Sequence, residues 1–380
     1  MNANSSAERP SAIAELPKTA AVVIVGGGVA GLATAWQLAE LGVRDVVLLE
    51  SEPMLATHAS GRNAAIFLPL EESLSAIWMA GRTRDLLDAR IGTSWLSVHG
   101  VALVAKAHEG IDELRYAARR LGVFHEHWSG EEVAEGVPQL EGGECEHALF
   151  LPLGGIMDVH LVLTRMRRWA ARAGVRIATQ AKVAELACQQ GRVRAVVLDD
   201  GRTIECERVV LAAGAWGGEL AAQAGSKLAL TPLRRHLVHL LGAEMPARAT
   251  PVVWRVDEPV YYRPEAGGIL ASPCDETPYA AGIPSCDPAA IEQLSGQLKR
   301  LSPKLAATAQ VQRSWACLRT MTVDREPAVG ADLQIKGLFW CAGLGGRGMT
   351  CGAACGELLA RTMLGLAHPI ARSLSLERFA

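Results

Sequence analysis

One stretch near the start of the chain decides the fold: Ala21-Val22-Val23-Ile24-Val25-Gly26-Gly27-Gly28-Val29-Ala30-Gly31. Its valine-rich first half predicts a buried parallel strand. Its second half carries glycines at the spacing G-x-G-x-x-G, and the amphipathic residues 32–39 after it predict a helix. A second apolar run over 46–49 ends in Glu50, which completes a unit of strand, glycine turn, helix, strand and acid.

This unit has the order of a dinucleotide-binding site. Gly26 permits a tight turn, Gly28 lets a pyrophosphate approach the backbone, and Gly31 lets helix and strand pack closely. The helix N-terminus, at Val29, offers unpaired N–H groups to phosphates. Glu50 can accept hydrogen bonds from ribose hydroxyls and would repel a 2′-phosphate. A purely structural glycine turn is the alternative, but the strand, the helix and the acid all fall in register for nucleotide binding.

Length and charge limit the class of protein. The chain has 380 residues, more than one compact core usually holds, so we expect two closely connected domains. It has 38 basic and 40 acidic residues, and this balance argues against a nucleic-acid binder. No apolar run approaches the length of a membrane span. Residues 1–18 lack the pattern of a signal peptide and predict a flexible tail.

The nine cysteines predict reduced thiols in a cytoplasmic protein, because their number is odd and their spacing forms no framework. Cys351 and Cys355 stand four residues apart, on one face of a predicted helix. A metal site there would need a nearby His or carboxylate to complete the ligand set, and none is present. We therefore expect packing residues here and no metal.

The remaining pattern predicts further helices and strands. Helices are expected over 74–91 with Ser73 as N-cap, over 110–122, and over 159–173 with Asp158 as N-cap. Short strands are expected within 101–106 and 175–211, where Asp199-Asp200-Gly201 is a hairpin signal. Residues 228–273 predict a second sheet, and the chain closes with a strand over 338–341 and a helix over 352–364.

Three later motifs carry a family resemblance. They are Thr57-His58-Ala59-Ser60-Gly61-Arg62-Asn63, Ala212-Ala213-Gly214-Ala215-Trp216, and the glycine block from Cys341 to Met349. With the opening stretch, and in this order, they resemble the FAD-dependent D-amino-acid oxidase superfamily. The chain is most similar to the branch that holds D-arginine dehydrogenase, glycine oxidase and sarcosine-oxidase-like subunits, over about residues 20–370.

The resemblance implies an α/β fold with a Rossmann-like FAD-binding domain and an inserted, mostly antiparallel β-sheet substrate domain. We expect the FAD-binding domain to be discontinuous, over 19–90, 155–223 and 316–372. The substrate-binding domain would then comprise 91–154 and 224–315.

The resemblance also implies which residues contact FAD. The predicted cofactor-binding residues come from the four motifs and their neighbours: Gly26, Gly28, Val29, Ala30, Gly31, Glu50, Ser51, His58, Ser60, Gly61, Arg62, Asn63, Ala64, Val183, Ala213, Gly214, Trp216, Gly345, Gly346, Gly348, Met349 and Thr350. His58 matches the histidine that carries covalent FAD in dimethylglycine dehydrogenase-like relatives, whereas other relatives with a histidine here bind FAD without a bond. Both states stay open, with non-covalent FAD as the prediction.

The expected chemistry is removal of a hydride from a carbon that bears an amine. Flavin supplies the electron sink, so the protein must orient a substrate carboxylate, for which arginine is suited by its two-pronged hydrogen bonding. By resemblance, Arg319 and Arg235 bind this carboxylate, and Tyr261 hydrogen-bonds it. Arg347 lies inside the closing glycine block, where it would touch flavin or a second acidic group, or lie on the surface.

The side-chain pocket predicts a neutral or apolar substrate, because Ile66, Phe67 and Leu68 stand where D-arginine dehydrogenase has polar residues. The acid that would meet a guanidinium is missing from the local stretch 98–102, although Glu71 lies nearby and would favour a basic substrate. We therefore expect an FAD-dependent amino-acid oxidase or dehydrogenase that acts on a small D-amino acid.

Three alternatives stay open: oxidation of a secondary amine of the sarcosine or proline type, oxidation of a 2-hydroxy acid, and a flavin-binding subunit of a larger complex. A homo-oligomer is also compatible with the sequence. The sequence does not assign the electron acceptor, which is oxygen or a quinone-like molecule.

Overall fold

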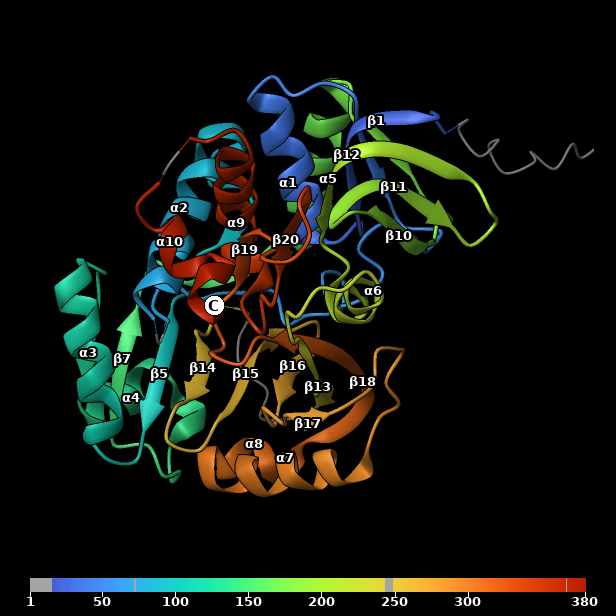
Figure 1. Cartoon of the computed structure of the whole chain (residues 1–380). Coiled ribbons are helices and arrows are strands. Elements are labelled where there is room, and N and C mark those ends of the chain that lie inside the picture. Colours follow the sequence, from blue (N-terminus) through green and yellow to red (C-terminus); the bar gives the residue numbers. More distant parts are fainter. Residues whose placement is uncertain (1–15, 72, 243–248, 367) are drawn as a thin grey trace, which may run out of the picture.

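The computed structural model describes residues 16–71, 73–242, 249–366 and 368–380. In Figure 1, a sheet with helices packed on it occupies the upper part of the molecule, and a second sheet with helices beneath it occupies the lower part. Residues 1–15 of the predicted tail lie outside the described residues, and the first strand begins at Thr19. The α/β class and the mostly antiparallel second sheet are confirmed.

Eight of the described strands form the upper sheet, which runs in the order β10-β11-β12-β1-β2-β9, with β20 paired to β12 and β19 paired to β20. Their bounds are β1 Thr19–Val25, β2 Val46–Leu49, β9 Arg176–Ala178, β10 Val183–Gln189, β11 Arg192–Leu198, β12 Thr203–Leu211, β19 Ala328–Ala331 and β20 Leu338–Ala342. The predicted hairpin joins β11 and β12, and Gly201 takes a positive φ of 86° at its turn.

The opening stretch forms the centre of this sheet. Strand β1 pairs in parallel with β2 and with β12, so that Val25 lies level with Leu49 and with Leu211. The carboxyl ends of these three strands therefore meet at one edge, which is where open α/β sheets bind ligands. The strands are buried on both faces, as their apolar sequences predict.

Four long helices pack beside this sheet (Figure 1). They are α1 Val29–Glu40, α2 Leu74–Ile91, α5 Val159–Arg172 and α9 Gly348–Met363. Both predicted caps are confirmed, because the Ser73 hydroxyl accepts from the Ala76 N–H and the Asp158 carboxylate accepts from the Leu161 N–H. Helix α9 begins four residues earlier than predicted, since Gly348 already has helical geometry instead of belonging to the preceding loop.

Helices α1 and α9 approach each other closely through small residues. A Cβ atom at Gly352 would lie 2.7 Å from the Val29 side chain, and one at Gly356 would lie 2.5 Å from the backbone of Ala33. Cys351 and Cys355 lie on α9 with their side chains buried against α2, which agrees with packing thiols.

Nine of the described strands form the lower sheet, in the order β17-β13-β16-β15-β14-β5-β7-β6, with β18 on β13. Their bounds are β5 Val101–Ala105, β6 Glu126–Trp128, β7 His147–Leu151, β13 Thr231–Leu241, β14 Val252–Arg255, β15 Val260–Glu265, β16 Gly268–Ser272, β17 Thr277–Pro278 and β18 Gln310–Met321. Helices α7 Pro288–Leu301 and α8 Pro303–Thr308 cover its lower face (Figure 1).

Smaller elements complete the described chain. A third sheet joins β3 Ile66–Phe67, β8 Gly155–Met157 and β4 Leu96–Ser97. The remaining described helices are α3 Glu109–Leu121, α4 Gly130–Gly136, α6 Gly217–Gln223 and α10 Ala371–Leu374, with single 3-10 turns at Pro138–Leu140, Gly214–Trp216 and Leu376–Phe379. Of the helices in the described ranges, none combines the length and the apolar character needed to cross a membrane.

Candidate functional site

A cavity of about 1110 Å³ lies between the carboxyl edge of the upper sheet and one face of the lower sheet. Small-ligand sites typically measure about 300–1,000 Å³, so this cavity has room for a large cofactor and a small substrate. Arg235, Tyr261, Arg319 and Arg347 all line the cavity, and so does every predicted cofactor-binding residue except two glycines, Gly31 and Gly61.

The glycine turn forms one end of the cavity. Gly26 has a φ of +108°, and a Cβ atom there would lie 2.5 Å from the Ala212 carbonyl oxygen. Gly31 is excluded from the cavity because it packs on the turn itself, where a Cβ atom would lie 1.9 Å from the Gly26 carbonyl oxygen. Gly28 faces the cavity, and the adjacent Val29 N–H donates to the Ser60 hydroxyl at 2.9 Å. The turn therefore offers exposed backbone and a helix N-terminus to an anionic group.

Glu50 is held at the edge of this turn by hydrogen bonds from its own neighbourhood. Its Oε2 accepts from the Gly27 N–H at 2.7 Å, and its Oε1 accepts from the Glu52 N–H at 2.9 Å and the Ser51 hydroxyl at 3.1 Å. Only 8% of Glu50 is exposed, yet the residue lines the cavity. A fixed carboxylate at the end of β2 suits the hydroxyls of a ribose.

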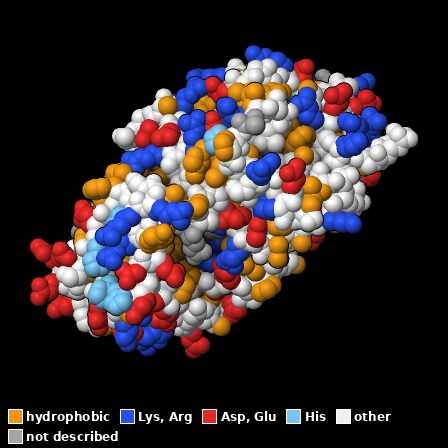
Figure 2. All heavy atoms as spheres, turned by 60° about the vertical axis from the view of Figure 1, so that its left-hand side comes forward, with side chains coloured by type: hydrophobic (Ala, Val, Ile, Leu, Met, Phe, Trp, Pro, Cys, Tyr) orange, Lys and Arg blue, Asp and Glu red, His pale blue; other side chains and the backbone are white. Residues whose placement is uncertain are grey.

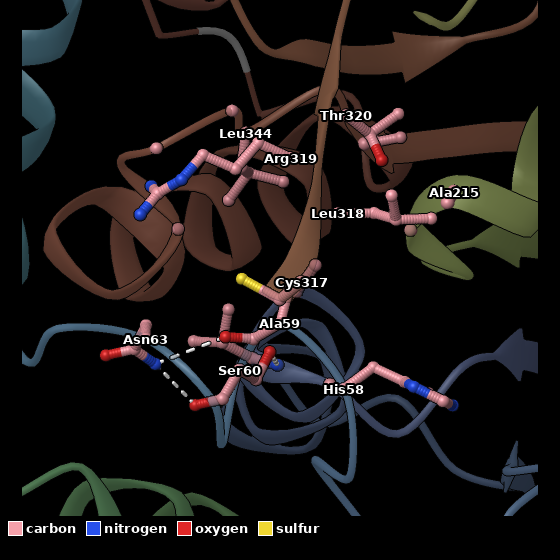
Figure 3. A pocket seen from close by; sticks show the side chains of 18 of the residues that line it. His58, Ala59, Ser60, Asn63, Ala215, Cys317, Leu318, Arg319, Thr320 and Leu344 are labelled. Atoms are coloured by element: carbon pink, nitrogen blue, oxygen red, sulfur yellow. Dashed lines mark hydrogen bonds between the residues drawn. The ribbon is translucent and has the colours of Figure 1, made fainter. Parts of the chain in front are cut away.

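The loop between β2 and β3 is ordered by its own polar side chains. Asn63 Nδ2 donates to the carbonyl oxygens of Ser60 and Ala59 at 2.7 and 3.3 Å, as the dashed lines of Figure 3 show. Gly61 supports this loop from outside the cavity, since a Cβ atom there would lie 2.4 Å from the Ala56 carbonyl oxygen.

His58 lies on the same loop and has two contacts. Its Nε2 lies 3.0 Å from Glu52 Oε1, and its ring centroid lies 4.6 Å from that of Trp216. In Figure 3 the imidazole of His58 and the guanidinium of Arg319 point to opposite sides of the view.

The closing glycine block forms the wall beside the turn. Gly345 takes a φ of +55°, and its N–H donates to the Thr320 carbonyl oxygen at 3.0 Å, which joins the block to β18. Helix α9 begins at Gly348, so the backbone N–H groups of Gly348, Met349 and Thr350 form its first turn and lie along the cavity. These N–H groups have no partner inside the helix and carry partial positive charge.

These features together fit FAD. The glycine cradle, the helix N-terminus and Glu50 suit an adenine dinucleotide, and the first turn of α9 suits a ring system that becomes negatively charged on reduction. Val183, Ala213, Gly214 and Trp216 add walls to the cavity from β10 and from the segment after β12.

One face of the lower sheet forms the opposite wall. Leu103, Trp254 and Tyr261 are register partners on β5, β14 and β15, and all three line the cavity. On β13 and β18, Arg235 pairs with Cys317. Arg319 stands two residues further along β18, so it shares the face of Cys317 (Figure 3).

Arg319 and Tyr261 form a buried polar pair. Arg319 is 9% exposed and Tyr261 1%, and within the part of the chain that the structure describes neither Arg319 Nε nor the Tyr261 hydroxyl has a hydrogen-bond partner. Among the described residues, Arg319 has no ion-pair partner. Burial raises the pKa of Tyr261, which keeps the phenol protonated, and the Arg319 charge offsets part of that rise. Burial lowers the pKa of Arg319, but nearby groups that include the Glu276 carboxylate raise it, and the net shift is upward, so the guanidinium stays charged.

The other two predicted arginines are held by acidic residues. Arg235 donates to Glu276 Oε1 and to the Asp275 carbonyl oxygen, both at 2.7 Å. Arg347 donates to the Arg325 carbonyl oxygen, and its Nη1 lies 3.8 Å from Glu326 Oε1. Arg347 therefore lines the cavity but is oriented by the loop between β18 and β19.

Two residues of the site carry no sequence motif and were not predicted. Glu276 and Arg325 line the cavity and form a bidentate ion pair, with Arg325 Nη2 at 2.8 and 2.9 Å from the two carboxylate oxygens. They lie on separate loops, so nothing in the linear sequence joins them. Of the predicted side-chain pocket, Ile66 and Leu68 line the cavity, whereas Phe67 packs away from it on Trp95.

The outer face of the molecule carries charges of both signs (Figure 2). A group of histidines stands out at one end, where the ring of His147 lies 6.0 Å from that of His108 and 6.2 Å from that of His127. Within the described ranges, no group of three or more His, Cys, Asp or Glu side chains has an arrangement that could hold a metal ion.

Several known proteins are similar in sequence to this chain over most of its length. Pyruvate dehydrogenase phosphatase regulatory subunit of Mus musculus is 27% identical over 99% of this chain and 45% of its own length. The 4-methylaminobutanoate oxidase (formaldehyde-forming) of Paenarthrobacter nicotinovorans is 28% identical over 92% of this chain and 44% of its own length. The chain thus spans less than half the length of these curated relatives.

The fold is also found among solved structures. L-proline dehydrogenase from P.horikoshii superposes with a TM-score of 0.86 at 20% identity, covering 96% of this chain and 98% of that one. The sequence model described as FAD dependent oxidoreductase matches residues 21–362, which include the glycine turn, Glu50 and the closing glycine block. The chain therefore belongs to the FAD dependent oxidoreductase family.

Proposed function

We propose that this protein oxidises the C–N bond of a small D-amino acid with a neutral or apolar side chain. The product is the imino acid, which water hydrolyses to a 2-oxo acid and ammonia. The observation that carries the proposal is the buried pair of Arg319 and Tyr261, which lines the same cavity as the FAD-binding motifs and whose Nε and hydroxyl groups have no hydrogen-bond partner among the described residues.

The pair is suited to a carboxylate. A guanidinium offers two parallel N–H groups to the two carboxylate oxygens, and a phenol adds one more donor. Because both groups are buried, hydrogen bonds from them are stronger than at the surface, and leaving them without a ligand is costly. A substrate carboxylate satisfies both groups and fixes one end of the substrate.

The rest of the wall selects the substrate side chain. Ile66, Leu68 and Trp254 present apolar surface to the cavity. Such surface favours an apolar side chain over a charged one, because a charge without a counter-ion would be desolvated there.

The cofactor would be held by the glycine turn, Glu50 and the first turn of α9. When bound, FAD accepts the hydride that the substrate carbon loses. The chain's own part is to hold the carboxylate at Arg319, to exclude water with the apolar wall, and to place the positive end of α9 beside the ring.

A second candidate is oxidation of a secondary amine, such as an N-methyl amino acid. It is favoured by the relative named 4-methylaminobutanoate oxidase (formaldehyde-forming), which matches 92% of this chain. The same carboxylate clamp serves either substrate, and only the group on nitrogen differs.

The test is an anaerobic titration of the FAD-loaded protein. Neutral D- and L-amino acids, N-methylglycine, proline isomers and 2-hydroxy acids are added separately, and loss of the flavin absorbance is recorded. We expect bleaching by neutral D-amino acids; bleaching by N-methyl compounds alone would favour the second candidate. Bleaching by hydroxy acids alone, or by nothing in the panel, would refute the proposal. Admission of air then shows whether oxygen reoxidises the flavin.

The role of Arg319 is tested by Arg319→Met, with Arg313→Met as the matched control. Arg313 lies on the same strand, is exposed and stacks over Trp315. Loss of a buried charged partner costs about 2–5 kcal/mol, so kcat/KM should fall at least about thirtyfold in the first variant. It should stay unchanged in the second.

A further inference from the structure

Glu276 is a solvent-exposed residue that lines the cavity, and two arginines hold its carboxylate in place. Its Oε1 accepts from Arg235 Nη2 at 2.7 Å, and both of its oxygens accept from Arg325 Nη2. Arg235 is 7% exposed, so its charge is neutralised inside the protein and not by solvent. The neighbouring carboxylate of Asp275 is engaged elsewhere, because it accepts from the backbone and ring nitrogens of His236 at 2.8 and 2.7 Å.

This carboxylate position adjoins the substrate clamp. Arg235 pairs with Cys317 across β13 and β18, and Arg319 is two residues from Cys317 on the same face. Arg235 and Arg319 are therefore diagonal neighbours, about 7–8 Å apart at their backbones. Both line the cavity together with Glu276. A molecule with two carboxylates a few bonds apart would place one on Arg319 and the other where Glu276 now stands.

We propose that Glu276 determines the charge class of the substrate. It fills the second carboxylate position, so the protein accepts amino acids with one carboxylate and rejects those with two. This inference rests on the proposed function, because it assumes that Arg319 holds the substrate carboxylate. In the native protein, Arg235 then binds the Glu276 carboxylate, and Glu276 is a specificity-determining residue.

Two physical effects produce the rejection. A second substrate carboxylate would have to displace one that is attached to the protein and therefore present at high effective concentration. It would also approach the negative charge of Glu276 in a partly buried site, where like charges repel strongly. Removing the side chain reverses both effects and leaves Arg235 without its carboxylate.

The experiment compares ligands that differ by one carboxylate. Butyrate and glutarate, which carry no amine and cannot be oxidised, are titrated calorimetrically into the FAD-loaded protein. D-glutamine and D-glutamate, which have nearly the same shape, are compared as substrates. The variants are Glu276→Ala, which removes charge and bulk, and Glu276→Gln, which removes charge alone and keeps the fold testable if the first variant is unstable.

The control is Glu258→Gln. Glu258 also bridges two arginines, Arg300 and Arg255, but it does not line the cavity. It therefore reports the effect of losing an equivalent ion-pair bridge on the same sheet without changing the site.

The native protein and the control should bind butyrate at least as well as glutarate. In Glu276→Ala the preference should shift toward glutarate by about tenfold to a hundredfold, the worth of one or two charged hydrogen bonds, with a smaller shift in Glu276→Gln. A native preference for glutarate, or equal ratios in all four proteins, would overturn the inference. If the calorimetric shift occurs while no amino acid is oxidised, the proposed function fails and the carboxylate position stands. If D-glutamine is oxidised but the Glu276 variants show no calorimetric shift, the proposed function stands and the inference about Glu276 fails.

Discussion

Arg319 Nη1 lies 2.7 Å from the point where a Cβ atom would stand at Gly346. Arg319 on β18 and the glycine block before α9 are therefore in direct contact. A side chain at this position would have to displace the guanidinium of Arg319.

Gly346→Ala should displace the tip of Arg319 without unfolding the chain, since a flexible side chain can move. We expect KM to rise about tenfold, as for the loss of one charged hydrogen bond, with FAD retained. Gly81→Ala on α2 is the control, because open space surrounds its Cβ position. An unchanged KM in the first variant would show that the contact does not position Arg319.

Tyr261→Phe should weaken substrate binding without weakening the fold. The hydroxyl has no hydrogen-bond partner among the described residues, so its loss leaves the thermal midpoint equal or higher, while KM rises about tenfold to a hundredfold. Tyr262→Phe is the matched control, because this neighbouring hydroxyl is also unpartnered but faces the core beneath the sheet. Equal effects of the two changes on KM would argue against a contact between Tyr261 and the substrate.

Gly26→Ala and Gly28→Ala should fail in different ways. The first puts a Cβ atom 2.5 Å from the Ala212 carbonyl oxygen at a φ of +108°, so the chain should not fold stably. The second puts a Cβ atom 3.0 Å from the Ser60 hydroxyl, so the chain should fold but bind FAD at least about tenfold more weakly. Circular dichroism and flavin fluorescence separate the outcomes, and normal FAD affinity in Gly28→Ala would contradict the assignment.

FAD should be released when the protein is precipitated with acid. Nε2 of His58 already has Glu52 as a partner at 3.0 Å, which favours a structural histidine over one bonded to flavin. We expect all of the flavin in the supernatant, for the native protein and for His58→Gln. A yellow pellet that turns colourless in the variant would instead show a covalent bond.

Glu276 should contribute stability at neutral pH that disappears in acid. Burial raises its pKa, but Arg325 and Arg235 outweigh burial and hold the pKa below the ordinary value of 4.5. The folded state therefore favours the charged form, so the contribution is complete above pH 4.5 and is lost as the pH falls through the lower folded value. Denaturant unfolding should show Glu276→Gln less stable than the native protein at pH 7 and a shrinking difference on acidification. A difference that is constant with pH would contradict this.

Local signals in the sequence located the nucleotide-binding unit and the helix starts. Ser73 and Asp158 cap their helices within three residues, and such short-range bonds can be inferred from the chain alone. The start of α9 was placed too late because its first turn is glycine-rich and resembles a loop.

The ion pair between Glu276 and Arg325 could not be inferred in this way. It depends on how two loops that are far apart in the sequence meet at the cavity, and ion pairs between loops leave no periodic pattern. Side chains alternate between the two faces along β13 and β18. This alternation shows that Arg235 and Arg319 share a face, but only when the pairing register of the two strands is known. The predicted domain boundaries and the roles of individual site residues stay predictions.

The contact of Gly352 and Gly356 with α1 has a consequence for the order in which the chain folds during its synthesis. The two helices are far apart in the sequence, and they approach most closely where a Cβ atom at Gly356 would meet the backbone of Ala33. During synthesis, the ribosome releases α1 long before α9 exists, so the nascent chain holds an unfinished cleft whose apolar side is open. The two helices can therefore pack together only after the segment that holds α9 has been synthesised, and contacts between such distant segments form slowly.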